Sequence, residues 1–439
     1  MERCRRTPYS ENVTNNAPAA SIGSLDQALS ADQVRDFITE NLADRDLSGR
    51  DVVVIVPDST RSCPLQLLMD TVYASLAPRV SRLRVLIALG THPEMTTAQI
   101  EKMFEVGPGG LTERYPRAEI INHEWWRPSE LTSIGTIPAS RVEELSEGRL
   151  SLDVDVSVNR AVVESDDVLI LGPVFPHEVV GFSGGTKYLF PGVSGQQMID
   201  ASHWLGALIT SAAMIGSPGI TPVRAMINEA AAKINTNLLA CCVVVQSGTH
   251  DLHGVAIGDV QAAWEAASAL SAQTHIRYLD RPVRRVISII PDRYDEMWTA
   301  AKGMYKVEPI VADGGEVIIY APHLSVVSHT HGAEIAKIGY HCRDYFSKQW
   351  DDFKDHPWGV LAHSTHLRGA GTWTPEDGEH DRVTVTLATA ISEDETRAHA
   401  LNYTDPASLD IDAARNDPDT LVVDNAGEVL FRLGEPPKL

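Results

Sequence analysis

The sequence predicts an α/β fold with mainly parallel sheets, divided into two domains with the active site in the cleft between them. Short runs of β-branched and other apolar residues recur along the 439-residue chain, and each run is followed by a loop with polar or titratable side chains. Helical patterns separate the runs. Continuous apolar runs of this length suit strands that are buried on both faces of a parallel sheet. Their alternation with helices is typical of the α/β class.

Six apolar runs are predicted as strands, and three stretches with helical periodicity are predicted as helices. The strands are DVVVIV (51–56), LRVLIAL (83–89), DVLIL (167–171), LLACCVVVQ (238–246), RVISII (285–290) and EVIIYA (316–321). The helices are 32–43, 63–77 and 221–234. Ligands of parallel sheets bind beyond the carboxyl ends of the strands. The loops that follow these runs are therefore the expected place for a site.

The order of strand, loop and helix restarts near Arg285, after the basic and proline-containing stretch RYLDRPVRR. We therefore expect a catalytic and cofactor-binding domain over residues 25–284. A C-terminal domain over residues 285–439 is expected to close the cleft and to end in β hairpins and loops. Residues 1–24 lack the apolar core of a signal peptide and are expected to form a mobile arm.

The composition excludes several classes of partner. The formal charge is -22, with 59 acidic and 37 basic residues, so no basic face is expected to bind nucleic acid. No apolar run reaches the roughly 18 residues that a membrane span requires. The five cysteines, Cys4, Cys63, Cys241, Cys242 and Cys342, form no CxxC pair and are interpreted as reduced thiols. We expect a cytoplasmic protein that binds a small molecule.

Four histidines are candidates for chemistry: His92, His123, His177 and His203. Histidine transfers protons near neutral pH and is the commonest metal ligand. A single histidine among 16 indicates little, because most lie at the surface or make one hydrogen bond in a core. His177 and His203 are stronger candidates, since they flank a glycine-rich loop that contains Lys187.

Charged residues after two of the predicted strands form a second set of candidates. Asp58 in PDSTR is a candidate N-cap for the following helix. Arg61, near the start of that helix, suits bidentate binding of a carboxylate. Lys302 is predicted to lie on a helix one turn after Trp298, where it could reach across the cleft.

The loop GFSGGTK contains Gly184, Gly185, Thr186 and Lys187. It resembles a phosphate cradle but is not a P-loop, because threonine precedes the lysine. The glycines permit positive φ and a close approach of the backbone, and successive N–H groups could hold an anion. Lys187 could then be a Schiff-base lysine, a phosphate contact or the attachment point of a cofactor.

Three segments together resemble the lactate racemase family, whose enzymes use a nickel-pincer nucleotide. They are PDSTR, GTHPEMT, and PVFPHEVVGFSGGTKYLFPG with the following SHW. The family has one histidine ten residues before the lysine and another sixteen residues after it, which here are His177 and His203. The resemblance extends from about Asp51 to Lys302.

The resemblance implies an isomerase that inverts C2 of a 2-hydroxy acid by reversible hydride transfer. Lys187 would carry the cofactor, pyridinium-3-thioamide-5-thiocarboxylic acid mononucleotide, through a covalent bond. Gly184, Gly185 and Thr186 would surround it, and His203 would be the nickel ligand. Separate biosynthetic enzymes would supply the cofactor.

The resemblance also implies roles around the substrate. His92 and His177 would be the paired acid and base, one for each face of the substrate. Arg61 and Lys302 would bind the substrate carboxylate. Asp58 would orient the residues next to Asp58 itself.

The sequence departs from the family pattern at one position. The family has an aromatic–Gln pair before the second-domain lysine, and this chain has Trp298 and Thr299. The change suggests that the enzyme is not strictly specific for lactate, and its substrate is expected to be lactate-like or a more polar acid such as a sugar acid. The polar loop 328–341, which contains His329 and His331, is a candidate to bind the hydroxyls of a sugar acid.

Two other enzyme classes and a binding protein are alternatives. A zinc hydrolase or lyase could use His92, His123, His177 and His203, but the sequence lacks an HExxH spacing and gives Lys187 no role. A pyridoxal-phosphate enzyme explains Lys187 but not the histidines. The third alternative is a non-catalytic protein that binds a hydroxy acid.

Overall fold

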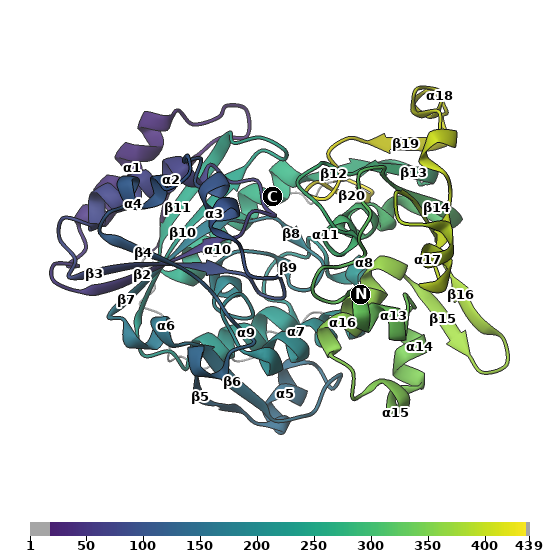
Figure 1. Cartoon of the computed structure of the whole chain (residues 1–439), viewed down its shortest axis with the longest axis horizontal. Helices are drawn as coiled ribbons and strands as arrows, with labels where there is room; N and C mark the ends of the chain where they lie inside the picture. Colours follow the sequence, from purple (N-terminus) through teal and green to yellow (C-terminus); the bar gives the residue numbers. More distant parts are fainter. Residues whose placement is uncertain (1–17, 436–439) are drawn as a thin grey trace.

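The computed structural model describes residues 18–435 and contains two main sheets with helices packed around them (Figure 1). The larger sheet has seven strands in the order β1-β11-β10-β7-β2-β3-β4, and the smaller has five in the order β18-β17-β14-β13-β19. The α/β class predicted from the sequence is confirmed. Among the described residues, no helix is both long and apolar enough to cross a bilayer.

Five strands of the larger sheet pair in parallel, and two antiparallel strands form one edge. The parallel strands are β2 (Asp51–Pro57), β3 (Arg82–Ala88), β4 (Ala118–Asn122), β7 (Asp167–Pro173) and β10 (Asn237–Val245). The edge consists of β11 (Leu252–Gly258) and β1 (Ala20–Gly23). Strand β1 therefore incorporates the end of the predicted mobile arm into the sheet, and residues 1–17 of that arm lie outside the described residues.

Both faces of the larger sheet are covered, because alternate side chains of its strands point to opposite sides. In β2, Val52, Val54 and Val56 pack against helices α1 (Ala31–Ala43) and α2 (Leu65–Leu76). The intervening side chains belong to the other core cluster, together with α7 (Gln196–Ile209), α9 (Pro222–Ala231) and α10 (Val260–His275). Burial on both faces explains why these strands are uninterrupted apolar runs.

All strands of the smaller sheet are parallel. They are β13 (Val283–Ile289), β14 (Val311–Ala321), β17 (Thr384–Thr389), β18 (Asn402–Tyr403) and β19 (Thr420–Val423). One core cluster contains side chains from both main sheets, so apolar packing is continuous between the two halves of the chain. The helices between these strands include α11 (Met297–Ala300), α12 (Lys302–Tyr305), α13 (Gly332–Ile338), α14 (Arg343–Lys348), α15 (Trp350–Phe353), α16 (Trp358–Arg368), α17 (Glu393–Ala398) and α18 (Ile411–Arg415).

The predicted domain boundary at 284/285 falls inside β13. The last strand, β20 (Leu430–Leu433), pairs with β12 (Ile276–Leu279), which precedes that boundary. The C-terminal region contains the predicted hairpin as β15 (Gly371–Thr374) and β16 (Gly378–Asp381), but β17 and β19 belong to the parallel sheet.

Smaller elements connect the strands of the larger sheet. The strands are β5 (Leu131–Ile137), β6 (Val154–Asn159), β8 (Pro176–His177) and β9 (Gly181–Phe182). The helices are α3 (Thr97–Met103), α4 (Gly110–Arg114), α5 (Ala139–Leu145), α6 (Arg160–Glu164) and α8 (Ser211–Met214).

Candidate active site

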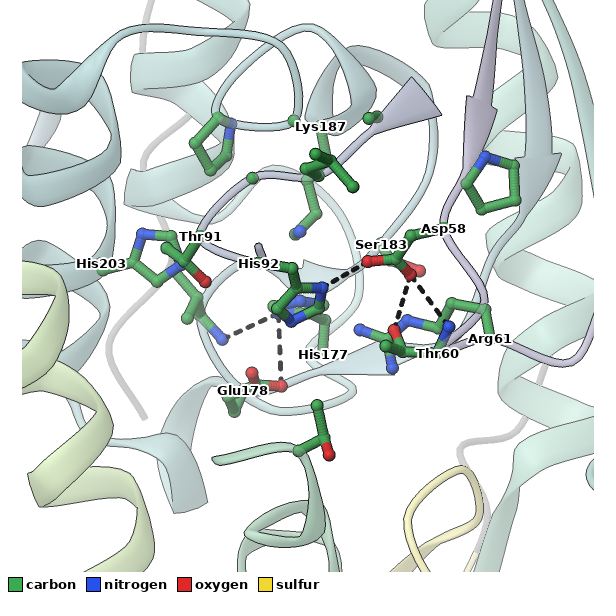
Figure 2. A pocket seen from close by; sticks show the side chains of 18 of the residues that line it. Asp58, Thr60, Arg61, Thr91, His92, His177, Glu178, Ser183, Lys187 and His203 are labelled. Carbon is green, nitrogen blue, oxygen red and sulfur yellow. Dashed lines mark hydrogen bonds and ion pairs between the residues drawn. The ribbon is translucent and has the colours of Figure 1, made fainter. Parts of the chain in front are cut away.

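A cavity lies between the two halves of the chain. Its first wall comes from the loops after β2, β3 and β7 and from α7, and its second wall comes from α11, α12 and α16. The following predicted residues line it: Asp58, Arg61, His92, His177, Gly184, Lys187, His203, Trp298 and Lys302. Figure 2 shows the first wall, where the labelled side chains converge from separate loops.

The glycine-rich loop directs Lys187 into this cavity (Figure 2). Gly184 has φ +82°, and a Cβ atom there would lie 2.5 Å from Cγ2 of Val174, so the position requires glycine. Beneath the loop, the buried Arg224 donates a hydrogen bond of 3.0 Å from Nη1 to the Gly184 carbonyl. Burial and, next, the charge of Arg61 lower the pKa of Lys187 to about 8. A considerable fraction of this amine is therefore neutral, and nucleophilic, near physiological pH.

Gly185 and Thr186 do not line the cavity, although they were expected to surround a cofactor. The Thr186 hydroxyl donates to Oδ1 of Asn228 at 2.6 Å and accepts from Nη1 of Arg224 at 3.1 Å. A Cβ atom on Gly185 would lie 3.0 Å from Cβ of Trp264. Both residues therefore support the loop from its core side.

His203 lies on α7 and has a defined tautomer. Its Nδ1–H donates to the Ile199 carbonyl at 2.7 Å, which leaves the lone pair on Nε2 available. Burial lowers the pKa of His203 to about 4, so the imidazole is neutral at physiological pH. A neutral imidazole whose other nitrogen donates to a carbonyl is the usual arrangement of a metal-ligating histidine.

Asp58 orients His92. One carboxylate oxygen forms a short hydrogen bond with Nδ1 of His92, and the other accepts the hydroxyl and the N–H of Thr60 at 2.7 and 3.0 Å (Figure 2). Burial alone would raise the pKa of Asp58, but His92 and Thr60 outweigh it and hold this pKa below its usual range. The prediction that Asp58 caps the next helix is wrong, since α2 begins after Pro64 without a side-chain cap. His92 donates from Nδ1, so in its neutral form the lone pair is on Nε2.

His177 has the opposite hydrogen-bonding state. Its Nδ1 accepts from the N–H of Val179 at 3.1 Å, so the proton of the neutral ring is on Nε2. Burial, followed by the charges of Lys187 and Arg61, lowers the pKa of His177 well below its usual value. One histidine of the predicted pair thus offers a lone pair, and the other offers an N–H.

Lys302 is buried in the second wall, where its Nζ has no hydrogen-bond partner among residues 18–435. The ammonium position is 4.4 Å from the centre of the Tyr294 ring. Burial and, next, Arg61 lower the pKa of Lys302 well below its usual value. An anionic ligand would supply the counter-charge that this group lacks.

Two histidines of α16 complete the second wall, and sequence reasoning missed them. His363 and His366 are three residues apart, which places them on one face of the helix. Nε2–H of His363 donates to the Trp298 carbonyl at 2.9 Å, and the two rings stack with centroids 3.8 Å apart. Within the described residues, Nδ1 of His363 and Nε2 of His366 have no partner. The HSTH pattern, with two histidines on one helical face, was the available signal.

The imidazoles of α16 are neutral. Burial lowers the pKa of His363 to about 3 and that of His366 to about 4. Neutral imidazole nitrogens can exchange hydrogen bonds with hydroxyl groups without adding charge to the wall.

The loop 328–341 does not line the cavity, contrary to the expectation that it binds substrate hydroxyls. His331 donates from Nε2 to the Thr91 carbonyl of the first half at 3.0 Å, and its ring lies 4.3 Å from that of Trp298. The backbone N–H of His329 donates to Glu296 at 2.6 Å. This loop therefore joins the two halves beside His92.

His123 is a core histidine. Its Nε2–H donates to the Ser194 carbonyl at 2.9 Å, and its Nδ1 accepts from Asn159 at 3.2 Å. In the part of the chain that the structure describes, no three His, Cys, Asp or Glu side chains are placed to hold a metal ion together. The donor set of the zinc alternative is therefore not assembled.

Comparison with known proteins connects this site with one family. Residues 24–216 match the lactate racemase N-terminal domain. The lactate racemase of Thermoanaerobacterium thermosaccharolyticum is 25% identical over 290 residues, which are 64% of this chain and 62% of the relative. The lactate racemase of Lactiplantibacillus plantarum is 23% identical over 307 residues. These residues are 68% of this chain and 64% of that relative. The matches therefore span less than two thirds of either racemase.

Two crystal structures extend the similarity over nearly the whole chain. A protein from Thermotoga maritima has a TM-score of 0.85 and 32% identity, covering 94% of this chain and 100% of that one. The lactate racemase apoprotein of T. thermosaccharolyticum shares the fold, with a TM-score of 0.68 at 20% identity over 92% and 93% of the chains. The chain therefore contains a lactate racemase N-terminal domain over residues 24–216, and it shares the fold of a lactate racemase over nearly its whole length.

Proposed function

We propose that this protein is a racemase or epimerase that inverts C2 of a 2-hydroxy acid. The observation that supports this most is the convergence of Lys187, His92, His177 and His203 in one cavity. A partly neutral lysine and a histidine with a free Nε2 suit a bound cofactor. The other two histidines, in opposite hydrogen-bonding states, suit proton transfer on a substrate oxygen.

The residues present fit a nickel-pincer nucleotide. Lys187 would form the covalent attachment, and Nε2 of His203 would bind nickel, for which imidazole is a suitable ligand. Gly184, whose positive φ and contact with Val174 require glycine, lets the loop bend so that Lys187 faces the cavity. When bound, this group supplies the hydride acceptor and donor for the C2 hydrogen.

Arg61 and Lys302 would bind the substrate carboxylate from opposite walls. The carboxylate would give Lys302 the charged partner that it lacks in the free protein. An adjacent anion favours the protonated amine and raises the lysine pKa again. The two cations would thus fix one end of the substrate and draw the walls together.

His92 would accept the proton of the C2 hydroxyl at Nε2. The Asp58 carboxylate would then stabilise the imidazolium through Nδ1–H. His177 would serve the opposite face. Its Nδ1 must first release the Val179 N–H, because a ring that accepts at Nδ1 already carries its proton on Nε2. The ring proton would therefore have to move from Nε2 to Nδ1 before Nε2 of His177 can accept a proton from the substrate.

The second wall favours a substrate that is more polar than lactate. The methyl group of lactate would leave the free nitrogens of His363 and His366 unsatisfied. An unsatisfied buried polar group costs about 1–3 kcal/mol. Hydroxyls beyond C2, as in an aldonic acid, would satisfy both groups.

The test uses protein produced together with the cofactor-biosynthesis enzymes. Single stereoisomers of lactate and of several aldonates, each deuterated at C2, are incubated with the protein and separated by chiral chromatography. We expect inversion with deuterium retained at C2, faster for an aldonate than for lactate. Washout of deuterium into water would indicate proton abstraction instead. Lys187→Arg, which keeps the charge but cannot form the attachment, should lose both the mass adduct and the inversion.

A further inference from the structure

Glu428 is a buried carboxylate that the proposed reaction does not use. It lies between β19 and β20 and is 0% exposed. Its Oε1 accepts the backbone N–H of Ser62 at 2.9 Å, and its Oε2 accepts the Ser62 hydroxyl at 3.0 Å. Oε2 also accepts the N–H of Gly248 at 3.0 Å and the hydroxyl of Ser247 at 3.2 Å, with Nη2 of Arg293 3.5 Å away.

The partners of Glu428 come from loops at the carboxyl ends of three strands. Ser62 follows β2, Ser247 and Gly248 follow β10, and Arg293 follows β13. The first two loops belong to the larger sheet and the third to the smaller sheet. The Glu428 side chain therefore contacts loops at the carboxyl edges of both sheets.

The same segment also contacts Lys302. Gly427 has φ +122°, and a Cβ atom there would lie 3.1 Å from Cβ of Lys302 and 2.8 Å from the Tyr294 ring. The Glu428 carbonyl accepts from Nζ of Lys306 at 3.4 Å. Gly427 therefore packs beside Lys302, while Glu428 contacts Lys306 through its carbonyl and holds Ser62, the residue next to Arg61, through its carboxylate.

We propose that Glu428 is a positioning residue that fixes the distance between Arg61 and Lys302. The inference rests on the proposed function, in which these two cations bind the substrate carboxylate. Two cations bind one carboxylate well only at a defined separation, and here they come from different sheets. The donors on Glu428 are N–H and O–H groups, so a carboxylate, which only accepts hydrogen bonds, holds this junction better than an amide.

The test compares cofactor-loaded wild type with Glu428→Gln. The amide is nearly isosteric, but its NH₂ group faces donors and loosens one side of the junction. We expect KM for the 2-hydroxy acid to rise ten- to a hundredfold, the order expected for a small misplacement, with a smaller change in kcat. The adduct mass on Lys187 should be unchanged.

Glu379→Gln is the matched control. Glu379 accepts from the Cys342 N–H at 2.5 Å and pairs with Nδ1 of His341 at 2.9 Å, and it does not line the cavity. This variant should lower thermal stability without raising KM. A KM that rises equally in both variants, or in neither, overturns the inference.

A second variant covers the case in which Glu428→Gln does not fold. Ser62→Ala removes one donor and keeps the backbone N–H, so KM should rise in the same direction by a few-fold. An unchanged KM for Ser62→Ala overturns the inference. Absence of inversion in the wild type contradicts the proposed function itself, and with it the positioning role.

Discussion

The two walls of the cavity differ in how far their polar groups are satisfied before a ligand binds. On the first wall, His92, His177 and His203 each have one ring nitrogen hydrogen-bonded within the chain, and none of their nitrogens is buried without a partner in the described part of the chain. On the second wall, Lys302, His363 and His366 each keep a buried nitrogen without a partner, counted over residues 18–435. A ligand would therefore find its unsatisfied buried partners on the second wall rather than among the three histidines of the first.

The two walls would therefore contribute to different steps, the first wall to the reaction and the second wall to ligand binding. Fixed tautomers on the first wall remove the need to reorganise His92 and His203 during the reaction. Each unsatisfied group on the second wall costs about 1–3 kcal/mol in the free protein, and a ligand that satisfies it recovers this free energy. Binding would thus favour closure of the second wall over the first.

The largest effect, a loss of inversion rate, is expected from replacing His92 on the first wall. His92→Ala should slow inversion from either stereoisomer by about 10²–10⁴-fold, because every turnover uses both histidines. Substrate affinity should change much less, since the carboxylate contacts remain. The measurement is the initial rate with each stereoisomer, with His123→Ala, a core histidine outside the cavity, as the control. Near-normal rates in both directions would remove His92 from the acid–base pair.

The next effect is the reactivity of Lys187. With a pKa of about 8, half of this amine is neutral at pH 8, whereas an ordinary lysine with a pKa near 10.4 is almost wholly charged. Amine-selective labelling of the cofactor-free protein at pH 8 should modify Lys187 about a hundredfold faster than exposed lysines if access is equal. The rate should fall as the pH drops below 8, because protonation removes the nucleophile. Peptide mass mapping gives the rate, and a midpoint near 10 would contradict the expectation.

The smallest effect is expected from replacing Lys302, and it tests the difference between the two walls most directly. Lys302→Met should weaken substrate binding by about 1.5–3 kcal/mol, the contribution of a charge-assisted hydrogen bond. The free protein should nevertheless become more stable, because a buried amine without a partner is replaced by an apolar group of similar length. Calorimetric titration and thermal unfolding measure the two effects.

Lys306→Met is the control for this comparison. Lys306 is one turn away and equally buried, but its Nζ donates to the carbonyls of Pro176 and Glu428. Its replacement should destabilise the free protein. If both variants change stability in the same direction, the contrast between satisfied and unsatisfied lysines does not hold.

The sequence by itself determined the fold class, the main strands and the identity of the titratable side chains that meet on the first wall. Runs such as 51–56 and 167–171 are buried on both faces, and this leaves a continuous apolar signal in the local sequence. The conformation around Lys187 is also encoded locally, because the residues that bend the loop lie within a few sequence positions of this lysine. The charged and histidine side chains of the first wall, Asp58, Arg61, His92, His177, Lys187 and His203, could therefore be predicted apart from Glu178.

Only the tertiary structure decided the second wall and the hydrogen-bonding state of the first. Whether His363 and His366 face a cavity, a core or solvent depends on how α16 packs against the other half of the chain. Glu428 meets Ser62 across 366 positions of sequence, a distance over which neither helical nor strand periodicity carries information. Asp58 was expected to cap a helix and instead holds His92, since a carboxylate accepts whichever donor the folded chain brings closest. Local patterns specify the elements, and long-range packing specifies the partners of each polar group.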